Sequence, residues 1–405
     1  MTAQLPQLPL LHVIGAGPWQ VATISRAQQL GFRVLASDGL AGRPGFAVAD
    51  LHELADITDP DATLAVARRH GISGVLCDTT DNGVIAAAHV AASLGLPGVG
   101  WSAALNCTDK ARMTACAQAA GLRVPASVKV DSPSAALSAA QGQGPWVIKP
   151  VDNQSGRGVS VVYSRSQLPT AVSAGLANSR QGQVLVQDFV VGQEIIVDSL
   201  VVAGVVHRLG LALKTPYADN PTIASRITYG ATQLSASALA RVDDGNRRLI
   251  RALGIEQGLV HAEYLLAGED VVPIDVAARG GGVHIYPVVL PHVSGVDAMR
   301  CAIELAMGQP VHVEPLVPGR AANIEFLRCE PGVIQAIEGV AQAQGMPGVA
   351  CVQLNRQAGD RLGGLHDKDQ RLGHLVTLAD TVEDAIRLGE HAARRLRVQV
   401  GAQPA

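Results

Sequence analysis

The sequence predicts an α/β (α+β) protein. Over the first hundred residues, short aliphatic runs at 10–17, 33–38 and 74–78 alternate with helical stretches at about 19–30, 59–70 and 82–94. Strands that alternate with helices are typical of a parallel sheet covered by helices. Later in the chain, strand-like runs come in pairs joined by short turns, which predicts antiparallel hairpins. Together these patterns indicate a mixed α/β architecture.

The later elements follow the same logic. The runs that predict hairpins lie at 146–150 with 158–164, at 194–213, and at 258–266 with 271–278. Helices are expected at 235–253, from about 295 to 307, and at 381–396. The residues Asp380 and Glu383 are spaced as a capping box that would open the last of these helices.

Composition limits the class of protein. A chain of 405 residues is long enough for two to four domains, at roughly 150 residues each. Hydrophobic residues make up 48% and charged residues 17%, which excludes a disordered chain. Aromatic residues are only 3%, so the core must be aliphatic. A net charge of −3 offers no basic surface for nucleic acid or for an anionic membrane.

Cysteine usage and the apolar segments favour a cytoplasmic protein. The six cysteines form no CxxC pair, and their spacing matches neither a zinc framework nor a disulfide framework. The N-terminal run has two prolines and no basic residue, so it is a poor signal peptide. No apolar stretch of about 18 residues predicts a membrane helix.

A glycine turn follows the first predicted strand. Gly15-Ala-Gly17 could hold an anion at the start of the next helix, but a dinucleotide site would have a third glycine where Gln20 stands. Asp38 ends the second strand, where a ribose-binding acid can lie. A close strand–helix turn explains the glycines better than an anion site does, and Asp38 alone is weak evidence. A nicotinamide-dependent oxidoreductase therefore has little support.

The middle of the chain is more informative. Lys149 ends an apolar strand, where an unpaired charge would be costly. It precedes a polar loop at 152–158 that contains Gly156 and Gly158, and such loops bring backbone N–H groups close to phosphates. Lys110 could add a second positive charge. The pattern predicts a phosphate site, although a simple β-turn would also explain the loop.

Two acids form a second constellation. Glu263 and Asp275 lie on the two strands of one predicted hairpin. If its loop is centred on Glu269, the carboxylates stand opposite each other, about 5 Å apart at Cβ, and a cation would be needed to neutralise them. Oxygen ligands beside phosphates suit Mg²⁺. An even-numbered turn would instead place the two acids on opposite faces. Arg279 follows directly, and its guanidinium suits a carboxylate or phosphate clamp.

Taken in order, these residues resemble the ATP-grasp superfamily, in its carbamoyl-phosphate-synthase-like carboxylate–amine ligase branch, and the L-amino acid ligases in particular. The resemblance covers nearly the whole chain. It implies a Rossmann-like pre-ATP-grasp domain at 1–105, an ATP-grasp domain at 106–312 with a nucleotide lid at about 123–190, and a C-terminal α+β domain at 313–405.

The resemblance also implies a role for each residue. Phosphates would be bound by Lys110, Lys149, Ser155, Gly156, Arg157 and Gly158. Adenine and ribose would be bound by Gln187, Asp188, Val190 and Glu194. The ions would be Mg²⁺, held by Glu263 and Asp275. Arg279, with Lys149, would be catalytic, and Arg279 and His284 would contact the substrate.

Two positions depart from the family pattern. The second metal ligand of the family is usually Glu followed two residues later by Asn, but this chain has Asp275 and Ala277. Alanine cannot ligate a metal, so water or another side chain would complete the site. Gln187 stands where many relatives have Glu, and its amide oxygen can still accept from an adenine amino group.

The expected activity is an ATP-dependent carboxylate–amine ligase that forms an acyl phosphate and then an amide. Its partners would be small carboxylates and amines, and a homodimer is compatible with the resemblance. Two alternatives stay open. A carboxylase or formyl-transferring enzyme would activate bicarbonate or formate by the same first step. A nucleotide-binding module without ligase activity would explain Ala277.

Overall fold

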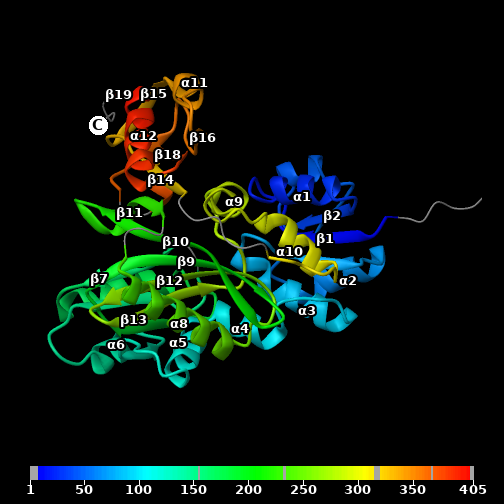
Figure 1. Cartoon of the computed structure of the whole chain (residues 1–405). Coiled ribbons are helices and arrows are strands. Elements are labelled where there is room, and N and C mark those ends of the chain that lie inside the picture. Colours follow the sequence, from blue (N-terminus) through cyan, green and yellow to red (C-terminus); the bar gives the residue numbers. More distant parts are fainter. Residues whose placement is uncertain (1–7, 154–155, 231–233, 314–319, 366–367, 402–405) are drawn as a thin grey trace, which may run out of the picture.

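The computed structural model describes residues 8–153, 156–230, 234–313, 320–365 and 368–401 (Figure 1). Within these ranges the strands form four sheets. The described helices include none that is long and apolar enough to cross a membrane. The expected mixture of parallel and antiparallel sheets is confirmed by this arrangement. The expected domain boundaries stay a prediction.

The N-terminal sheet is parallel, as the alternating pattern predicted. Its order is β3-β2-β1-β4. These strands are β1 (Leu10–Ile14), β2 (Arg33–Asp38), β3 (Leu51–Leu54) and β4 (Gly74–Leu76). The helices α1 (Gln20–Gln29) and α2 (Pro60–His70) lie between these strands in the chain, and α3 (Val84–Leu94) follows β4. Gly71 ends α2 in the left-handed conformation, with φ of 61°.

The space beside the glycine turn after β1 is filled by the side chain of Gln20. The side chain of Gln20 donates to Asp78 Oδ1 at 3.0 Å and lies beside the turn, where a Cβ at Gly15 would be 3.3 Å from Gln20 Cδ. Asp38 accepts from the backbone N–H of Ala16 at 3.0 Å and from Arg43. Both polar residues therefore stabilise the end of the sheet.

A small antiparallel sheet follows two helices, α4 (Trp101–Thr108) and α5 (Lys110–Ala119). Its order is β5-β8-β6-β7. The strands are β5 (Ser127–Val130), β6 (Trp146–Pro150), β7 (Ser160–Val162) and β8 (Val184–Asp188). The helices α6 (Pro133–Ala139) and α7 (Leu168–Leu176) pack on it, and Trp146 is buried among their aliphatic side chains. The predicted pairing of 146–150 with the following run is confirmed.

A long sheet forms the centre of the molecule, in the order β13-β12-β9-β10-β11-β14-β18-β16. The first five of these strands are β9 (Gln193–Val202), β10 (Val205–Tyr217), β11 (Asn220–Tyr229), β12 (Gly258–Ala267) and β13 (Asp270–Ala277). The helix α8 (Ala236–Leu253) packs against it. The predicted turn at Ala203-Gly204 is confirmed, because Val202 pairs with Val205.

The hairpin β12–β13 corrects one expectation. Its turn is not centred on Glu269, because Ala267 pairs with Asp270 around a two-residue turn. That even-numbered turn alone would have placed the two acids on opposite faces. A β-bulge between Glu263 and Tyr264 shifts the register, and Glu263 pairs with Asp275 after all. The predicted opposition is confirmed, but the bulge and not the turn produces it.

The C-terminal strands extend the central sheet. The strands β14 (Ala321–Leu327), β16 (Val349–Leu354) and β18 (Gly373–Ala379) join it through the pairing of β11 with β14. A further sheet contains β15 (Gly332–Glu338), β17 (Arg361–Leu362) and β19 (Arg397–Gly401), and α11 (Val340–Gln344) and α12 (Val382–Arg395) complete this region. Thr381, and not Asp380, caps α12, because its side chain accepts from the N–H of Asp384. The expected capping box was therefore placed one residue early.

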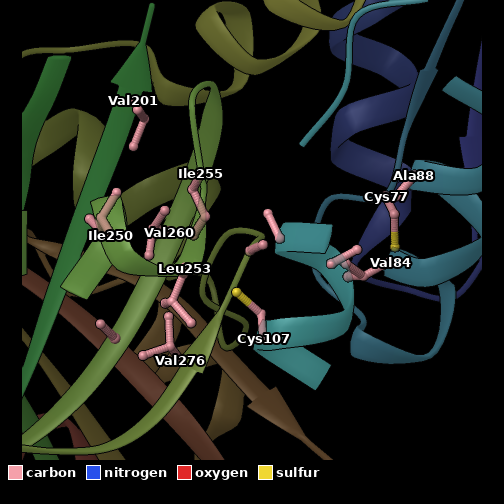
Figure 2. Close-up of a cluster of buried hydrophobic side chains, with 14 of the residues drawn as sticks. Cys77, Val84, Ala88, Cys107, Val201, Ile250, Leu253, Ile255, Val260 and Val276 are labelled. Atoms are coloured by element: carbon pink, nitrogen blue, oxygen red, sulfur yellow. The ribbon is translucent and has the colours of Figure 1, made fainter. Parts of the chain in front are cut away.

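The largest core joins the N-terminal region to the central sheet. Figure 2 shows aliphatic side chains of β9, α8, β12 and β13 on one side, and Cys77, Val84 and Ala88 on the other, with Cys107 between them. The short helix α9 (Leu290–Ser294) and α10 (Ala298–Ala306) lead the chain away from the hairpin, and α10 packs against α1 and β4. Aliphatic packing on this scale holds the elements around the hairpin in fixed positions.

Candidate active site

Two lysines approach the acidic hairpin from different elements. Lys110 begins α5, and its Nζ lies 3.0 Å from Asp275 Oδ1 and 2.9 Å from the carbonyl oxygen of Asn153. Lys149 lies near the end of β6, is 6% exposed, and donates to the carbonyl oxygen of Ile274 at 3.2 Å. Ile274 is the residue left without a partner by the register shift in the hairpin. The bulge therefore both aligns the acids and directs a carbonyl at Lys149.

Burial and charge act on these lysines in opposite directions. Burial, and then the positive charge of Lys110, lowers the pKa of Lys149 from 10.5 to about 8. Burial alone would also lower the pKa of Lys110, but the carboxylate of Asp275 outweighs it and the pKa is raised. Lys149 is thus a buried ammonium whose nearest partner is a neutral carbonyl. A bound anion would stabilise its charged form.

A third lysine joins two carboxylates on the neighbouring strands. Lys214 of β10 is 8% exposed and bonds to Glu194, and its Nζ lies 3.2 Å from Glu263 Oε2. Burial raises the pKa of Glu194 above its ordinary value. Burial alone would do the same to Glu263, but Lys214, Lys368 and His261 lower its pKa instead. Glu263 is therefore firmly ionised, as a cation ligand must be.

A hydrogen-bonded group of Tyr229, Asp198 and His261 lies beside Glu263. His261 Nδ1 lies 2.7 Å from Asp198 Oδ1, and its Nε2 lies 3.9 Å from Glu263 Oε1. Asp198 also accepts from the hydroxyl of Tyr229 at 2.6 Å, and it is 1% exposed. His261 pairs directly with Ala277, the position where the family pattern has Asn. The histidine therefore occupies the side of the site where the missing amide would have stood.

Arg279 is held by an acid from the N-terminal region. Its Nε and Nη2 donate to the two carboxylate oxygens of Asp81 at 2.6 and 3.1 Å, and its Nη1 donates to the carbonyl of Gly280. Burial alone would raise the pKa of Asp81, but the guanidinium outweighs it and the pKa is lowered. This bidentate pair fixes the plane of the guanidinium.

The glycine loop lies beside the same charges. Ser155 lies outside the described residues, and its predicted role stays a prediction. Gly156 and Gly158 have φ of 71° and 73°, and a Cβ on Gly156 would lie 3.6 Å from Lys368 Nζ. Arg157 is exposed, with its Nε 3.8 Å from Asp369. The two glycines therefore have the left-handed conformation that other residues rarely adopt.

The three residues predicted to contact adenine lie at the end of β8. Gln187 is 5% exposed, whereas Asp188 is exposed and Val190 is partly buried. The N–H of Asp188 already donates to Ala126 at 2.9 Å. Roles for these residues stay predictions.

The hydrogen-bond partners of the His284 side chain are residues of β16 rather than the acids and lysines. Its Nε2 is 2.9 Å from Gln353 Oε1 and 3.2 Å from Cys351 Sγ, both on β16. Of the other predicted residues, Lys110, Lys149, Glu194, Glu263, Asp275 and the glycine loop come together. Arg279 is instead bonded to Asp81, and the residues predicted to contact adenine lie at the end of β8. Sequence reasoning missed Lys214, His261, Asp81 and Lys368. A lysine or histidine within an apolar strand run was a usable signal for the first two, whereas Asp81 and Lys368 lie in polar segments.

The residues fit a divalent cation beside phosphates. Glu263 and Asp275 supply carboxylate oxygens from directly opposed positions on the hairpin. In this structure Lys214 and Lys110 balance their negative charges. Such hard oxygen donors suit Mg²⁺. A nucleotide would replace the carboxylate and carbonyl partners of the lysines with phosphate oxygens.

Comparison with known proteins identifies this arrangement. A model of the ATP-grasp domain matches residues 143–286, which include Lys149, the glycine loop and the acidic hairpin. The chain contains an ATP-grasp domain. A second model, L-amino acid ligase C-terminal domain 2, matches residues 325–401 of this ATP-grasp protein. The expected ATP-grasp family is confirmed.

Two curated relatives extend the likeness along the chain. The formate-dependent phosphoribosylglycinamide formyltransferase of Synechococcus sp. (strain CC9605) is 33% identical over 195 residues, 46% of this chain and 48% of that protein. The protein of the same name from Synechococcus sp. (strain CC9311) is 24% identical over 396 residues, 96% of this chain and 97% of that one. The ATP-grasp protein is thus similar to the second of these proteins over nearly its whole length, and to the first over about half of it.

A solved structure shares the fold. The L-amino acid ligase from Bacillus licheniformis superposes with a TM-score of 0.83 at 20% identity, covering 98% of this chain and all of that one. At this identity the likeness is one of fold. The expected fold class, an ATP-grasp fold with α/β regions on either side, is confirmed.

Proposed function

We propose that this ATP-grasp protein is an ATP-dependent ligase that joins the carboxylate of an amino acid to an amine, with release of ADP and phosphate. The observation that carries the proposal is the convergence of Lys110 and Lys149 on the hairpin that bears Glu263 and Asp275. The matches to the ATP-grasp domain and to the L-amino acid ligase C-terminal domain support the same class.

The chemistry follows from what a carboxylate lacks. A carboxylate is a poor electrophile at neutral pH, so phosphoryl transfer to it gives an acyl phosphate that an amine can attack. Lys110 and Lys149 would neutralise the phosphates during that transfer. Mg²⁺ held by Glu263 and Asp275 would add positive charge at the same phosphates.

Arg279 would orient the carboxylate. Its Nε and Nη2 donate to Asp81 and its Nη1 donates to the carbonyl of Gly280, so the guanidinium is held in one plane. The second N–H of each Nη atom would bind the substrate carboxylate or the acyl phosphate. Fixing the acceptor in this way supplies part of the rate by positioning. His261, anchored by Asp198, would keep Glu263 in place and would cover the position of the missing Asn.

The test measures ADP release that depends on an amino acid pair. Lys149→Ala and Glu263→Ala should each lower turnover at least 100-fold, because each removes a charge from the transition state. Lys129→Ala is the matched control for the first, since Lys129 is exposed on the same small sheet, and Glu269→Ala is the control for the second. Turnover like that of the unmodified protein in either site variant would refute the assignment.

A second candidate is a formyl-transferring or carboxylating enzyme. The curated relatives named as formate-dependent formyltransferases favour it. Because the first step is shared, the ATP-site variants do not separate the two functions. ADP release that requires formate or bicarbonate, and is indifferent to amino acids, would favour the second candidate. A homodimer and a cytoplasmic location stay predictions.

A further inference from the structure

A second cluster of ligand-type side chains lies away from the carboxylates of the ATP site. It consists of His284, Cys351 and His374, called here the His–Cys–His cluster. One ring nitrogen of each histidine and the sulfur of the cysteine all lie within 4.8 Å of one another. The pair His284 Nε2 and Cys351 Sγ is already at 3.2 Å.

The fold brings the cluster together from distant parts of the chain. On the antiparallel pair β16–β18, Gln353 stands opposite His374 and Cys351 stands opposite Val376. Because alternate residues share a face, Cys351 lies diagonally from His374 on the same side of the sheet. His284 arrives from the turn after β13, where it has φ of 59°. A left-handed backbone is uncommon for such a residue, and it marks a constrained position.

His374 carries an unsatisfied nitrogen. The residue is 3% exposed, and its Nε2 is buried with no hydrogen-bond partner among the described residues. A buried polar atom without a partner costs free energy, so it needs an explanation. The ring of Trp19 packs edge-on against His284 at 5.2 Å and lies 6.0 Å from His374, which gives the cluster an apolar wall.

We propose that the His–Cys–His cluster binds one borderline-soft divalent metal ion, of which Zn²⁺ is the type. Two imidazoles and one thiolate are ligands that favour Zn²⁺ over Mg²⁺. The thiol of Cys351 releases its proton to solvent when the metal binds, and no electron transfer is involved. Gln353, whose amide oxygen lies 2.9 Å from His284 Nε2, or a water completes four ligands.

The observed spacing is close to what such an ion requires. Zn–S of about 2.3 Å and Zn–N of about 2.0 Å place sulfur and nitrogen roughly 3.5 Å apart in a tetrahedral site. The Cys351–His284 separation of 3.2 Å is near that value. The other ligand atoms all lie within 4.8 Å of one another, so rotation of the side chains would bring them to it. The metal would join the turn after β13 to strands β16 and β18.

The experiment uses the full chain without ATP, after treatment with a chelator, and titrates it with Co²⁺. One equivalent should bind, with a thiolate-to-cobalt absorption band in the near ultraviolet and visible bands of tetrahedral intensity, and Zn²⁺ should displace both. Cys351→Ser should abolish the thiolate band, and His374→Gln should weaken binding at least tenfold. Cys329→Ser is the matched control, a partly buried cysteine between β14 and β15.

Two results would overturn the site. One is the lack of a thiolate band in the unmodified chain, which needs no variant to fold. The other is a band that persists in Cys351→Ser while circular dichroism shows the native fold. Because the readout is absorption without nucleotide, failure of the ligase proposal would leave this result unaffected, and the reverse also holds.

Discussion

Replacing Lys214 with methionine tests whether the paired carboxylates depend on this lysine. Lys214 is 8% exposed and contacts both Glu194 and Glu263, whose side chains are 32% and 24% exposed. Removing one partner of a buried ion pair costs about 3–5 kcal/mol, and the partial exposure of the acids places this case near the lower end, about 3 kcal/mol. With a urea slope of about 3 kcal/mol/M, the unfolding midpoint should fall by roughly 1 M at pH 7.

The loss of stability in Lys214→Met should depend on pH. Lys214 holds the pKa of Glu263 below its ordinary value of 4.5 even though burial opposes this shift. A carboxylate with a depressed folded-state pKa contributes stability above its unfolded value and loses it as the pH falls through the folded value. The difference between the unmodified chain and Lys214→Met should therefore be full at pH 7 and shrink below about pH 4.5. Urea unfolding followed by circular dichroism measures it, with Lys129→Met, an exposed lysine, as control. An unchanged midpoint at pH 7, or a loss that is equally large at pH 3.5, would contradict the reasoning.

Two further predictions concern residues that are proposed to bind phosphate. Because burial lowers the pKa of Lys149 to about 8, kcat/KM for ATP should fall as the pH of the free enzyme rises through about 8. Lys149→Arg should keep its positive charge, so its kcat/KM should not fall over this range. A flat pH profile of the unmodified enzyme up to about pH 9.5 would argue against a phosphate role for Lys149. Gly158→Ala should lower the free energy of unfolding by about 1–3 kcal/mol, since its φ is 73° and a Cβ would meet Asn178 Cβ at 2.8 Å and Pro150 Cγ at 2.9 Å. Gly182→Ala, with φ of 66° and no atom within 4 Å, should cost less, and an equal loss at both positions would show that the close contacts do not matter.

The sequence by itself determined most of the secondary structure. Alternating aliphatic runs and helical stretches predicted the parallel N-terminal sheet, and the Ala203-Gly204 turn predicted a hairpin that the structure contains. These signals are local, because periodicity and turn residues act within about ten positions. Lys149, Glu263 and Asp275 were visible for a related reason, since charge within an apolar strand needs a partner.

The tertiary structure decided what those residues touch. The acids face each other because a bulge corrects a two-residue turn, and nothing in the hairpin sequence shows the bulge. Strand order brings Lys214 and His261 to Glu263. The cysteines gave no metal spacing in the sequence, yet Cys351 meets two histidines from positions 284 and 374. Such contacts depend on register and strand order set by segments far apart in the chain, so only the assembled central sheet places them together.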